Sequence, residues 1–511
     1  MFSKRRKVAV RPSKAFQRQR HNDQLPFLTR SRFGALPQLR VIDEEPENLT
    51  LFIAILYVID LFGVFPLITL PSLLAQLGFF GIPLVLSVIM LQIYTSFLLS
   101  KCWTMAERLD ASIVQKSRYP YAAIADLAYG PYLSLFVTIL LDLSIFAMGI
   151  PNLVVASENL ELVVQRISDD RYTFSFCYWV IIVGLFICPL MWLGSPKHMR
   201  SLAILSVCVV IIIVILLWFC LFNAAPLGKP FEGISLDLPP FLTVLNGYSV
   251  LAFQFDIHPM LLTLQIDMQQ KSQVRWAAFG GIIVTCSIAI FGSIIAAYKF
   301  GTMIAENILE TLPKSVPLVC LLILMALQLC FSTIVGSSAL FLQIENYFRV
   351  PDALSLKRIG IRSFILALEL LIAEFIPDFD VLMGVVGGTI SGPLVFILPP
   401  LLYRRISRMV RTHQRIATEA AYGSMKLDLN YDPMRMELEP ISSTETESAL
   451  RVYWQRLVQS YRRLQCNISM SLAVLVFGLV ATFFSTYLNI FKISNLFRNN
   501  SPCFGNLTQW F

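Results

Sequence analysis

The chain has 511 residues and a formal net charge of +8, and 56% of its residues are hydrophobic while only 14% are charged. Soluble domains carry roughly a quarter charged residues, so this composition excludes a water-exposed globular protein of this size. The basic excess is expected to set membrane topology and to contact lipid headgroups, and we do not expect nucleic acid as a partner.

The chain begins with a hydrophilic, basic segment, residues 1–50, which a long apolar run follows. From Leu51 to Ser100 the only charged side chain is Asp60. Apolar runs of about 18 residues or more predict helices that span a membrane. Because the first run is long enough to span, we expect no cleavable signal peptide and interpret residues 1–50 as a cytoplasmic tail.

Eleven such runs predict an all-α polytopic membrane protein with about eleven transmembrane helices. Spans one to ten, residues 51–403, would form a transporter core of two five-helix repeats, 51–222 and 241–403, in opposite orientation. The eleventh helix, within 467–491, would follow this core. The predicted spans are 51–77, 80–103, 132–157, 176–194, 202–222, 241–267, 275–298, 316–345, 361–377, 381–403 and 468–491.

The charges of the loops predict the orientation. One set of alternate loops holds 12 Lys and Arg residues and the other set holds 5; the first set is 101–131, 195–201, 268–276 and 346–363. The positive-inside rule therefore places that set, the N-terminus and the long loop 404–466 in the cytoplasm. The tail 492–511 is then extracellular or lumenal, and the sequons that begin at Asn499 and Asn506 are predicted to be glycosylated.

The loop 404–466 is predicted to contain an amphipathic helix near its end. Its apolar residues recur at helical spacing, and they are Trp454, Leu457, Val458, Tyr461 and Leu464. Such a helix lies on the inner leaflet or packs on the bundle, and the sequence leaves both alternatives open.

The cysteines indicate neither a metal site nor a cofactor. The ten cysteines form no CxxC pair and no cluster with histidine. Cys177, Cys320 and Cys503 lie near span ends on the predicted outer side, where they form a disulfide or remain packing residues. The chain also lacks a His-Glu-x-x-His, a Gly-x-Ser-x-Gly and a phosphate-binding loop, so we do not expect an enzyme or an ATP-driven pump.

Two predicted spans contain helix-breaking residues at corresponding positions of the two repeats. The first span holds Asp60-Leu-Phe-Gly-Val-Phe-Pro66, and the sixth holds Phe253-Gln-Phe-Asp-Ile-His-Pro259. A proline removes a helical hydrogen bond, and the freed carbonyl groups are tolerated where they line a cavity. Paired interrupted helices are typical of a substrate site, although simple kinks are the alternative. The predicted substrate-binding residues are Asp60, Gly63, Val64, Phe65, Pro66, Phe253, Phe255, Asp256 and Ile257.

Ionisable side chains at mid-membrane depth are costly and therefore indicate function. Four lie at such depth: Asp60, Asp142, Asp256 and His258. We expect Asp142 to hydrogen-bond neighbouring helices. We predict that a proton drives the carrier and that Asp256 and His258 bind it. The alternative is that these two residues have a structural role only and tie the break to neighbouring helices. Sodium coupling through Ser332 and Thr333 is the alternative.

Short motifs follow one another in a specific order. They are Ser157-Glu-Asn-Leu160, Phe253-Gln-Phe with His258-Pro259, Arg362-Ser, Gly384-Val-Val-Gly-Gly388 and Phe396-Ile-Leu-Pro-Pro400. With these motifs the region 51–403 resembles the amino acid/auxin permease family, which includes proton-coupled, sodium-coupled and vesicular amino acid transporters. The resemblance implies eleven spans, an inverted-repeat core of ten helices, and an amino acid held between spans one, three, six and eight.

One departure from the family pattern concerns the first span. The family's Gly-x-Gly before Leu-Pro aligns with Val64 and Pro66, although Gly63 lies beside them. We expect secondary transport of an amino acid coupled to a proton, in the plasma membrane or an endolysosomal membrane. A sodium symporter and a non-transporting sensor of the same fold are the alternatives.

Overall fold

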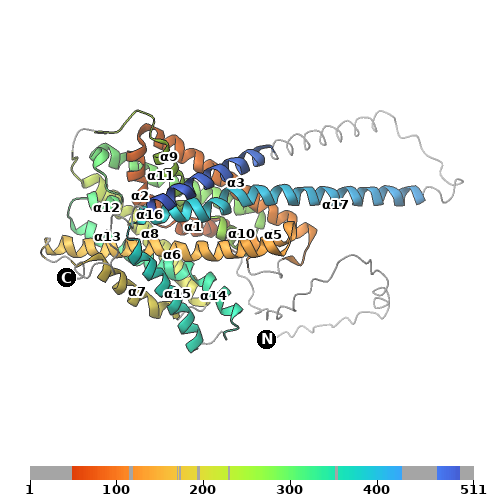
Figure 1. Ribbon diagram of the computed structural model, residues 1–511, viewed down its shortest axis with the longest axis horizontal. Helices are drawn as coiled ribbons and strands as arrows, with labels where there is room; N and C mark the ends of the chain where they lie inside the picture. Colours follow the sequence, from red (N-terminus) through yellow and green to blue (C-terminus); the bar gives the residue numbers. More distant parts are fainter. Residues whose placement is uncertain are drawn as a thin grey trace, which may run out of the picture. The chain divides into compact units, whose positions relative to one another are not determined.

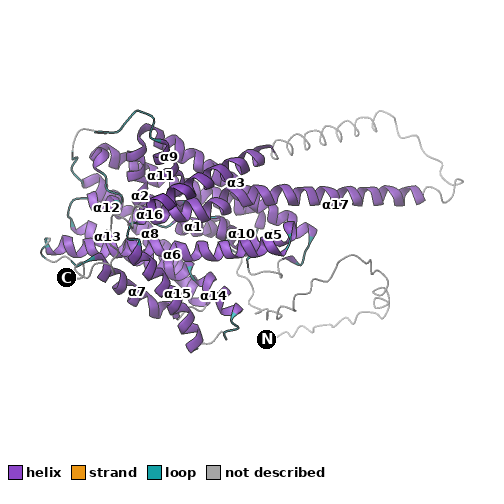
Figure 2. Cartoon of the chain, viewed as in Figure 1, coloured by secondary structure: helices purple, strands orange, loops and turns teal. Residues whose placement is uncertain are grey.

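The computed structural model describes residues 49–113, 119–169, 171, 174–192, 196–227, 231–351, 355–428 and 469–494. Within these residues the regular structure is helical, apart from one isolated bridge between Leu49 and Met268 (Figure 2). Seven of the described helices are long and apolar enough to cross a membrane, and two shorter ones, Leu51–Phe62 and Phe176–Trp192, are also apolar. The chain is therefore an all-α polytopic membrane protein.

Helical segments occur at each of the eleven predicted positions (Figure 1). The inverted symmetry of the two halves stays a prediction. The principal helices are α1 (Leu51–Phe62), α2 (Phe65–Leu77), α3 (Gly81–Leu109), α5 (Pro120–Tyr129), α6 (Pro131–Ser168), α7 (Phe176–Trp192), α8 (Pro196–Asn223), α9 (Phe241–Gln254), α10 (His258–Asp267), α11 (Val274–Phe300), α12 (Ile308–Thr311), α13 (Val316–Gly336), α14 (Ser338–Tyr347), α15 (Leu356–Phe375), α16 (Phe379–Val385), α17 (Leu398–Asp428) and a last helix, Ser469–Ser494.

The first and sixth spans are each interrupted, as their sequences predict. Gly63 ends α1 with φ of 57° and ψ of −140°, a conformation open essentially only to glycine. Pro66 lies in the first turn of α2, where the N–H that it lacks would have no helical partner. The sixth span breaks between Gln254 and His258, and Pro259 lies in the first turn of α10. The prediction of paired interrupted helices is confirmed.

The interrupted helices lie within a layer of closely packed spans. Helices α1 and α2 pack on α11, α3 packs on α9 and α10, and α13 packs on both α6 and α8. Away from these contacts the helices present apolar side chains, and Leu135, Phe136 and Ile139 of α6 are each more than half exposed. An exposed apolar face of this kind is the surface that a membrane-spanning helix offers to lipid.

The tenth span is longer and less regular than predicted. It begins as α16, passes through π-helical stretches at Val386–Ser391 and Pro393–Ile397, and continues as α17 to Asp428 (Figure 1). Residues 404–428 are therefore helical, and the assignment of 404–466 to a cytoplasmic connection stays a prediction. The arginines there end the apolar run but are good helix formers, so the helix continues past it. The amphipathic segment 454–464 lies outside the described residues.

Two other predictions concern residues near the outer ends of the spans. Cys177 is disulfide-bonded, whereas Cys320 is a free thiol and does not take part in the predicted disulfide. Cys503 and the sequon residues Asn499 and Asn506 lie outside the described residues. Within the described part of the chain, no group of three or more His, Cys, Asp or Glu residues could hold a metal ion.

Candidate functional site

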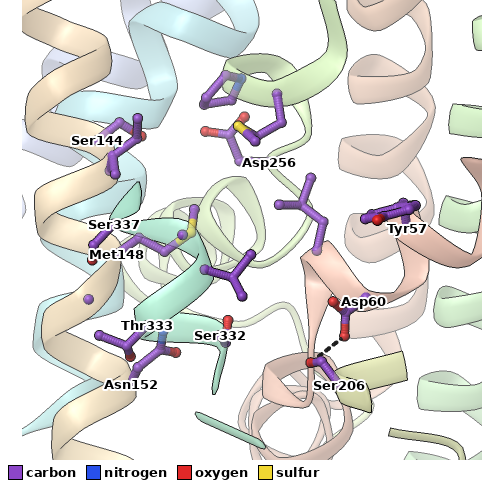
Figure 3. Close-up of a pocket in the computed structure, with 17 residues that line it drawn as sticks. Tyr57, Asp60, Ser144, Met148, Asn152, Ser206, Asp256, Ser332, Thr333 and Ser337 are labelled. Atoms are coloured by element: carbon purple, nitrogen blue, oxygen red, sulfur yellow. Dashed lines mark hydrogen bonds between the residues drawn. The ribbon is translucent and has the colours of Figure 1, made fainter. Parts of the chain in front are cut away.

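A cavity of about 160 Å³ lies among α1, α6, α8, α10 and α13 (Figure 3). The α6 wall presents Ser144, Met148 and Asn152, which recur every four residues and so share one helix face. Asp60 and Asp256 are the only acidic or basic side chains among the described residues that line the cavity. The cavity therefore combines hydroxyl and amide groups with two acidic groups and no basic one.

A second cavity, of about 20 Å³, adjoins the first at the break in the first span. Its walls include Gly63, Val64 and Phe65 of the break, together with Phe253 and Asp256 of the sixth span. Five residues line both cavities, and they are Leu61, Met148, Asn152, Asp256 and Ser332. The break in the first span thus opens onto the same space as the acidic groups.

The two helix starts at the breaks differ in the donors that they leave free. The first N–H groups of a helix have no partner within it, so the start of α2 at Phe65 can receive an anion. In α10 the N–H of His258 donates to Asp256 Oδ1 over 3.0 Å, and Pro259 has no N–H. The third N–H group is used in the same way in both helices, because Met260 donates to the Ile257 carbonyl group and Leu67 donates to that of Val64. The two starts therefore differ at one donor, the N–H group of Phe65, and this donor makes the start of α2 the better anion site.

Asp60 is held from two other helices. Ser206 Oγ of α8 lies 2.8 Å from Asp60 Oδ1 and 2.7 Å from Gln328 Oε1 of α13. Gln328 Nε2 donates to Asp60 Oδ1 over 3.4 Å. Figure 3 shows the Asp60 side chain at the cavity wall opposite α6, with Ser206 beside it. These contacts fix one carboxyl oxygen at the end of α1.

The small cavity is closed toward the N-terminal part of α9 by two contacts between α2 and α9. The Phe65 and Phe253 rings meet edge to face with centroids 5.8 Å apart. Next to them Gln254 Nε2 donates a hydrogen bond to Thr69 Oγ1, which itself donates to the Phe65 carbonyl group. The larger cavity lies on the other side of the break, along α1 and α10.

The carbonyl groups at the end of α9 are satisfied from α3. Gln92 is fully buried, and its Nε2 lies 3.3 Å from both the Leu251 and Ala252 carbonyl oxygens. The Ala252 oxygen loses its helical donor where α9 stops, because the Asp256 N–H donates to Phe253 instead, whereas the Leu251 oxygen still accepts from the Phe255 N–H over 3.4 Å. The buried Gln92 amide therefore replaces one donor and adds to the other. The interruption of the sixth span is therefore stabilised by a side chain from another helix.

His258 faces away from the cavities. Its Nε2 lies 3.0 Å from Thr95 Oγ1 of α3, its Nδ1 lies 3.5 Å from Asp256 Oδ1, and its side chain is fully buried. It lines neither cavity, whereas Asp256 lines both. Of the two residues predicted to carry the coupling proton, Asp256 alone reaches the site, and that role stays a prediction for both.

A polar cluster lies on the opposite side of the Phe65–Phe253 contact. Lys492 of the last helix donates to Asn246 Oδ1 of α9 over 2.7 Å and lies 3.6 Å from Asp380 of α16. Burial, with Asp378 and Asp380 adding to it, raises the pKa of the nearby Glu306 to about 7. These groups join the sixth, tenth and last helices at this end.

Most predicted site residues meet, and a few do not. Pro66, Phe255 and Ile257 are buried but line neither cavity. Ser332 lines both cavities and Thr333 the larger one, beside Asp60, so the predicted sodium ligands lie next to an acidic group. Asp142 accepts a hydrogen bond of 2.7 Å from Tyr119, which fits the expected helix-to-helix role.

The sequence prediction missed Ser206, Gln328 and Asn152. All three line a cavity, and none is charged. Gln328 and Asn152 are amides within otherwise apolar spans, a signal that could have identified them. Ser206 carries no such signal, because serines are common in membrane helices.

Comparison with known proteins places this site in a family. The family model described as "Transmembrane amino acid transporter protein" matches residues 49–420. The chain belongs to the transmembrane amino acid transporter family. The matched region of this family member includes both interrupted helices and every residue that lines the two cavities.

Individual relatives in this transporter family are distant. Amino acid transporter AVT1J of Arabidopsis thaliana is 22% identical over 362 residues, which are 67% of this chain and 79% of the relative. Amino acid transporter AVT1I of the same plant is 22% identical over 359 residues, 66% of this chain and 82% of the relative. The human vesicular inhibitory amino acid transporter is 24% identical over 354 residues, 66% of each chain.

Proposed function

We propose that this transporter-family member carries neutral amino acids across a membrane as a proton-coupled secondary transporter. One observation carries the proposal. The two interrupted spans, with a free helix start at Phe65 and carboxyl groups at Asp60 and Asp256, meet at one cavity. An amino acid has a carboxylate and an ammonium group, which are the two charges that this arrangement accommodates.

The substrate would bind with its carboxylate at the start of α2. The Phe65 N–H group of that turn lies near Gly63, which has no side chain to keep an anion away. The ammonium group would then lie toward Asp60 and Asp256, which line the adjoining cavity. The Met148 and Leu61 side chains at the boundary of the two cavities would contact the substrate side chain.

The charges of the cavity support a neutral substrate. No lysine, arginine or histidine is among the described residues that line either cavity, so an acidic side chain would have no cation as partner. Burying an unpaired carboxylate at this depth is costly. Aspartate and glutamate are therefore expected to be poor substrates.

The hydrogen bonds around Asp60 support a proton as the coupling ion. The Ser206 hydroxyl lies between two acceptors, Asp60 Oδ1 and Gln328 Oε1, but it has one hydrogen to donate. A protonated Asp60 resolves this, because it donates to Ser206 Oγ while Ser206 donates to Gln328. The alternative is a Gln328 side chain with its amide oxygen and nitrogen exchanged. Its oxygen would then lie 3.4 Å from Asp60 Oδ1, and two acceptors at this distance repel each other if Asp60 is ionised.

The proposed function is tested by uptake into proteoliposomes that contain the full chain. We expect neutral amino acids to accumulate when the outside is made acidic, and acidic ones not to accumulate. The panel is repeated at equal pH with an inward sodium gradient, which tests the Ser332–Thr333 alternative. Sodium-driven accumulation that is insensitive to pH would exclude the proton, and no uptake of any amino acid would favour a sensor.

Asp60→Asn separates binding from coupling. The amide keeps the shape but carries no exchangeable proton, so pH-driven accumulation should fall by about tenfold, within the range typical of coupling between two sites. Asp142→Asn is the matched control, because Asp142 binds Tyr119 and lines neither cavity. A pH dependence of Asp60→Asn that equals the wild type would assign the proton to Asp256 or elsewhere.

The orientation and the membrane are part of the proposal. The larger cavity lies along the first half of α6 and the last residues of α13, the ends that adjoin the loops predicted to be cytoplasmic. This arrangement would correspond to a carrier whose site faces the cytoplasm. The plasma membrane and an endolysosomal membrane both remain open for it.

A further inference from the structure

Helix α15 carries a carboxyl group that takes no part in the site described above. Glu369 is fully buried, and neither of its carboxyl oxygens has a hydrogen-bond partner among the described residues. Its position in the ninth span is far from both ends of the apolar run, so no headgroup or bulk water explains it. A buried carboxyl group within a membrane helix is expected to have a function.

The Glu369 carboxyl group lies against a wall of the larger cavity. A Cβ atom added to Gly149 of α6 would be 2.8 Å from Glu369 Oε1 and 3.1 Å from Oε2. The carboxyl group therefore occupies the space of the side chain that Gly149 lacks. Gly149 itself lines the larger cavity. The backbone of α6 at Gly149 therefore lies between Glu369 and the space in which the substrate is proposed to bind.

Among the described residues, no cation pairs with Glu369. Helices α6, α7 and α14 pack on α15 (Figure 1). On α15 itself, Arg358 and Arg362 pair with Glu345 of α14, and Arg362 is seven residues from Glu369, about 10 Å along the helix axis. Two other cations lie on these helices, both far along the helix axis: Lys357 is 12 residues from Glu369, and Arg166 of α6 is 17 residues from Gly149 and donates to the Glu310 carbonyl group. The remaining titratable groups are phenols, thiols and acids, and they are Tyr132, Asp142, Glu158, Glu161, Cys177 in its disulfide, Tyr178, Cys188, Tyr347 and Glu374.

These surroundings decide the protonation state in this conformation. An ionised carboxylate without partner or water is far less favourable in such a place than a neutral carboxyl group. Glu369 therefore holds a proton while it is packed against Gly149. Ionisation and the packed contact between α6 and α15 exclude each other unless water enters between the two helices.

We propose that Glu369 is a second proton-binding site of this carrier, separate from the carboxyl groups in the cavity. When the contact at Gly149 opens, Glu369 transfers its proton to a water molecule, which leaves a carboxylate and a hydronium ion; closure requires the reverse transfer. Linkage makes the effect reciprocal, so a proton on Glu369 stabilises the packed conformation. The role of Glu369 in transport rests on the proposed function, whereas its protonation does not.

The protonation is tested without transport, by infrared spectroscopy of the purified full chain in lipid at neutral pH. Ordinary carboxyl groups are ionised there, so a C=O stretch from a protonated carboxyl group reports a buried acid. Asp60 and Glu374 can add to this band, so we expect Glu369→Gln to lose one component of it and Glu374→Gln to retain that component. Glu374 is the matched control, because it is a buried acid on the same helix whose oxygens also lack partners. An identical band in Glu369→Gln and the wild type overturns the proposal.

The role in the cycle is tested in proteoliposomes with the amino acid that the wild type takes up best. Glu369→Gln is permanently neutral, so we expect net uptake driven by a pH gradient to fall by about tenfold, while exchange at equal pH stays within about twofold of the wild type. Glu374→Gln should retain both activities. Equal losses in the two variants, or a normal pH-driven uptake in Glu369→Gln, overturn the role. If the wild type transports no amino acid, the proposed function fails while the infrared result still stands.

Discussion

Replacing Gly63 with leucine is expected to abolish amino acid uptake while the protein still reaches the membrane. Gly63 has φ of 57° and ψ of −140°, and a residue with a Cβ atom adopts such a conformation at a cost of roughly 1–3 kcal/mol. Gly63 also lines the small cavity at the break, which a leucine side chain would fill. Both effects act where the substrate carboxylate is proposed to bind. The measurement is initial uptake rate against surface expression.

Gly130→Leu is the matched control for Gly63→Leu. Gly130 also has a positive φ, 90°, and an added Cβ would meet nothing within 4 Å. It precedes α6 and lines neither cavity, so its substitution reproduces the backbone strain without filling the site. Uptake by Gly63→Leu with unchanged rate and apparent affinity would contradict the site assignment. A loss of uptake that is equal in both variants would attribute the effect to strain alone.

Replacing Arg362 with alanine is expected to have the largest effect on stability. Its side chain is almost completely buried, and Nε lies 2.6 Å from Glu345 Oε1. A second nitrogen donates to the Met191 carbonyl group over 2.6 Å, and the guanidinium lies 5.1 Å from the centre of the Phe341 ring. Removing one partner of a buried ion pair costs roughly 3–5 kcal/mol, and Arg362→Ala should lie near the lower end because Arg358 stays 3.2 Å from Glu345. The variant should therefore melt at a clearly lower temperature in detergent.

Arg405→Ala provides the comparison for Arg362→Ala. Arg405 also donates to a carbonyl group, that of Ala128, and lies over an aromatic ring, that of Tyr129. It is exposed at the end of the tenth span, so water can replace its contacts and the melting temperature should change little. Arg362→Lys should be intermediate, because lysine keeps the charge but cannot donate in two fixed directions. Equal melting temperatures for Arg362→Ala and Arg405→Ala would contradict this account.

The candidate site divides into residues that act locally and residues that act across helices. Gly63 and Pro66 shape the break through their own backbone, and Asp256 caps the next helix through a contact two residues away. Ser206 and Gln328 act on Asp60 from other spans, 146 and 268 residues away along the chain. The first group is visible in a sequence, whereas the second depends on which faces of three helices meet.

The sequence by itself determined the membrane character, the positions of the spans and the two interruptions. Each of these follows from short stretches of chain: apolar runs exclude water, and a glycine or proline alters the backbone where it stands. The same reasoning placed Asp60, Gly63 and Asp256 at one site. It did not predict the helix at residues 404–428, because the end of an apolar run marks the edge of the membrane and need not end a helix.

Only the tertiary structure decided which polar groups face one another. A membrane helix that is apolar on every side has no strong 3.6-residue pattern, so its rotation about its own axis cannot be read from the sequence. That rotation turns His258 toward Thr95 and leaves Asp256 at the cavity. It also brings Glu369 against Gly149, where a missing side chain on α6 leaves the space for a buried carboxyl group on α15.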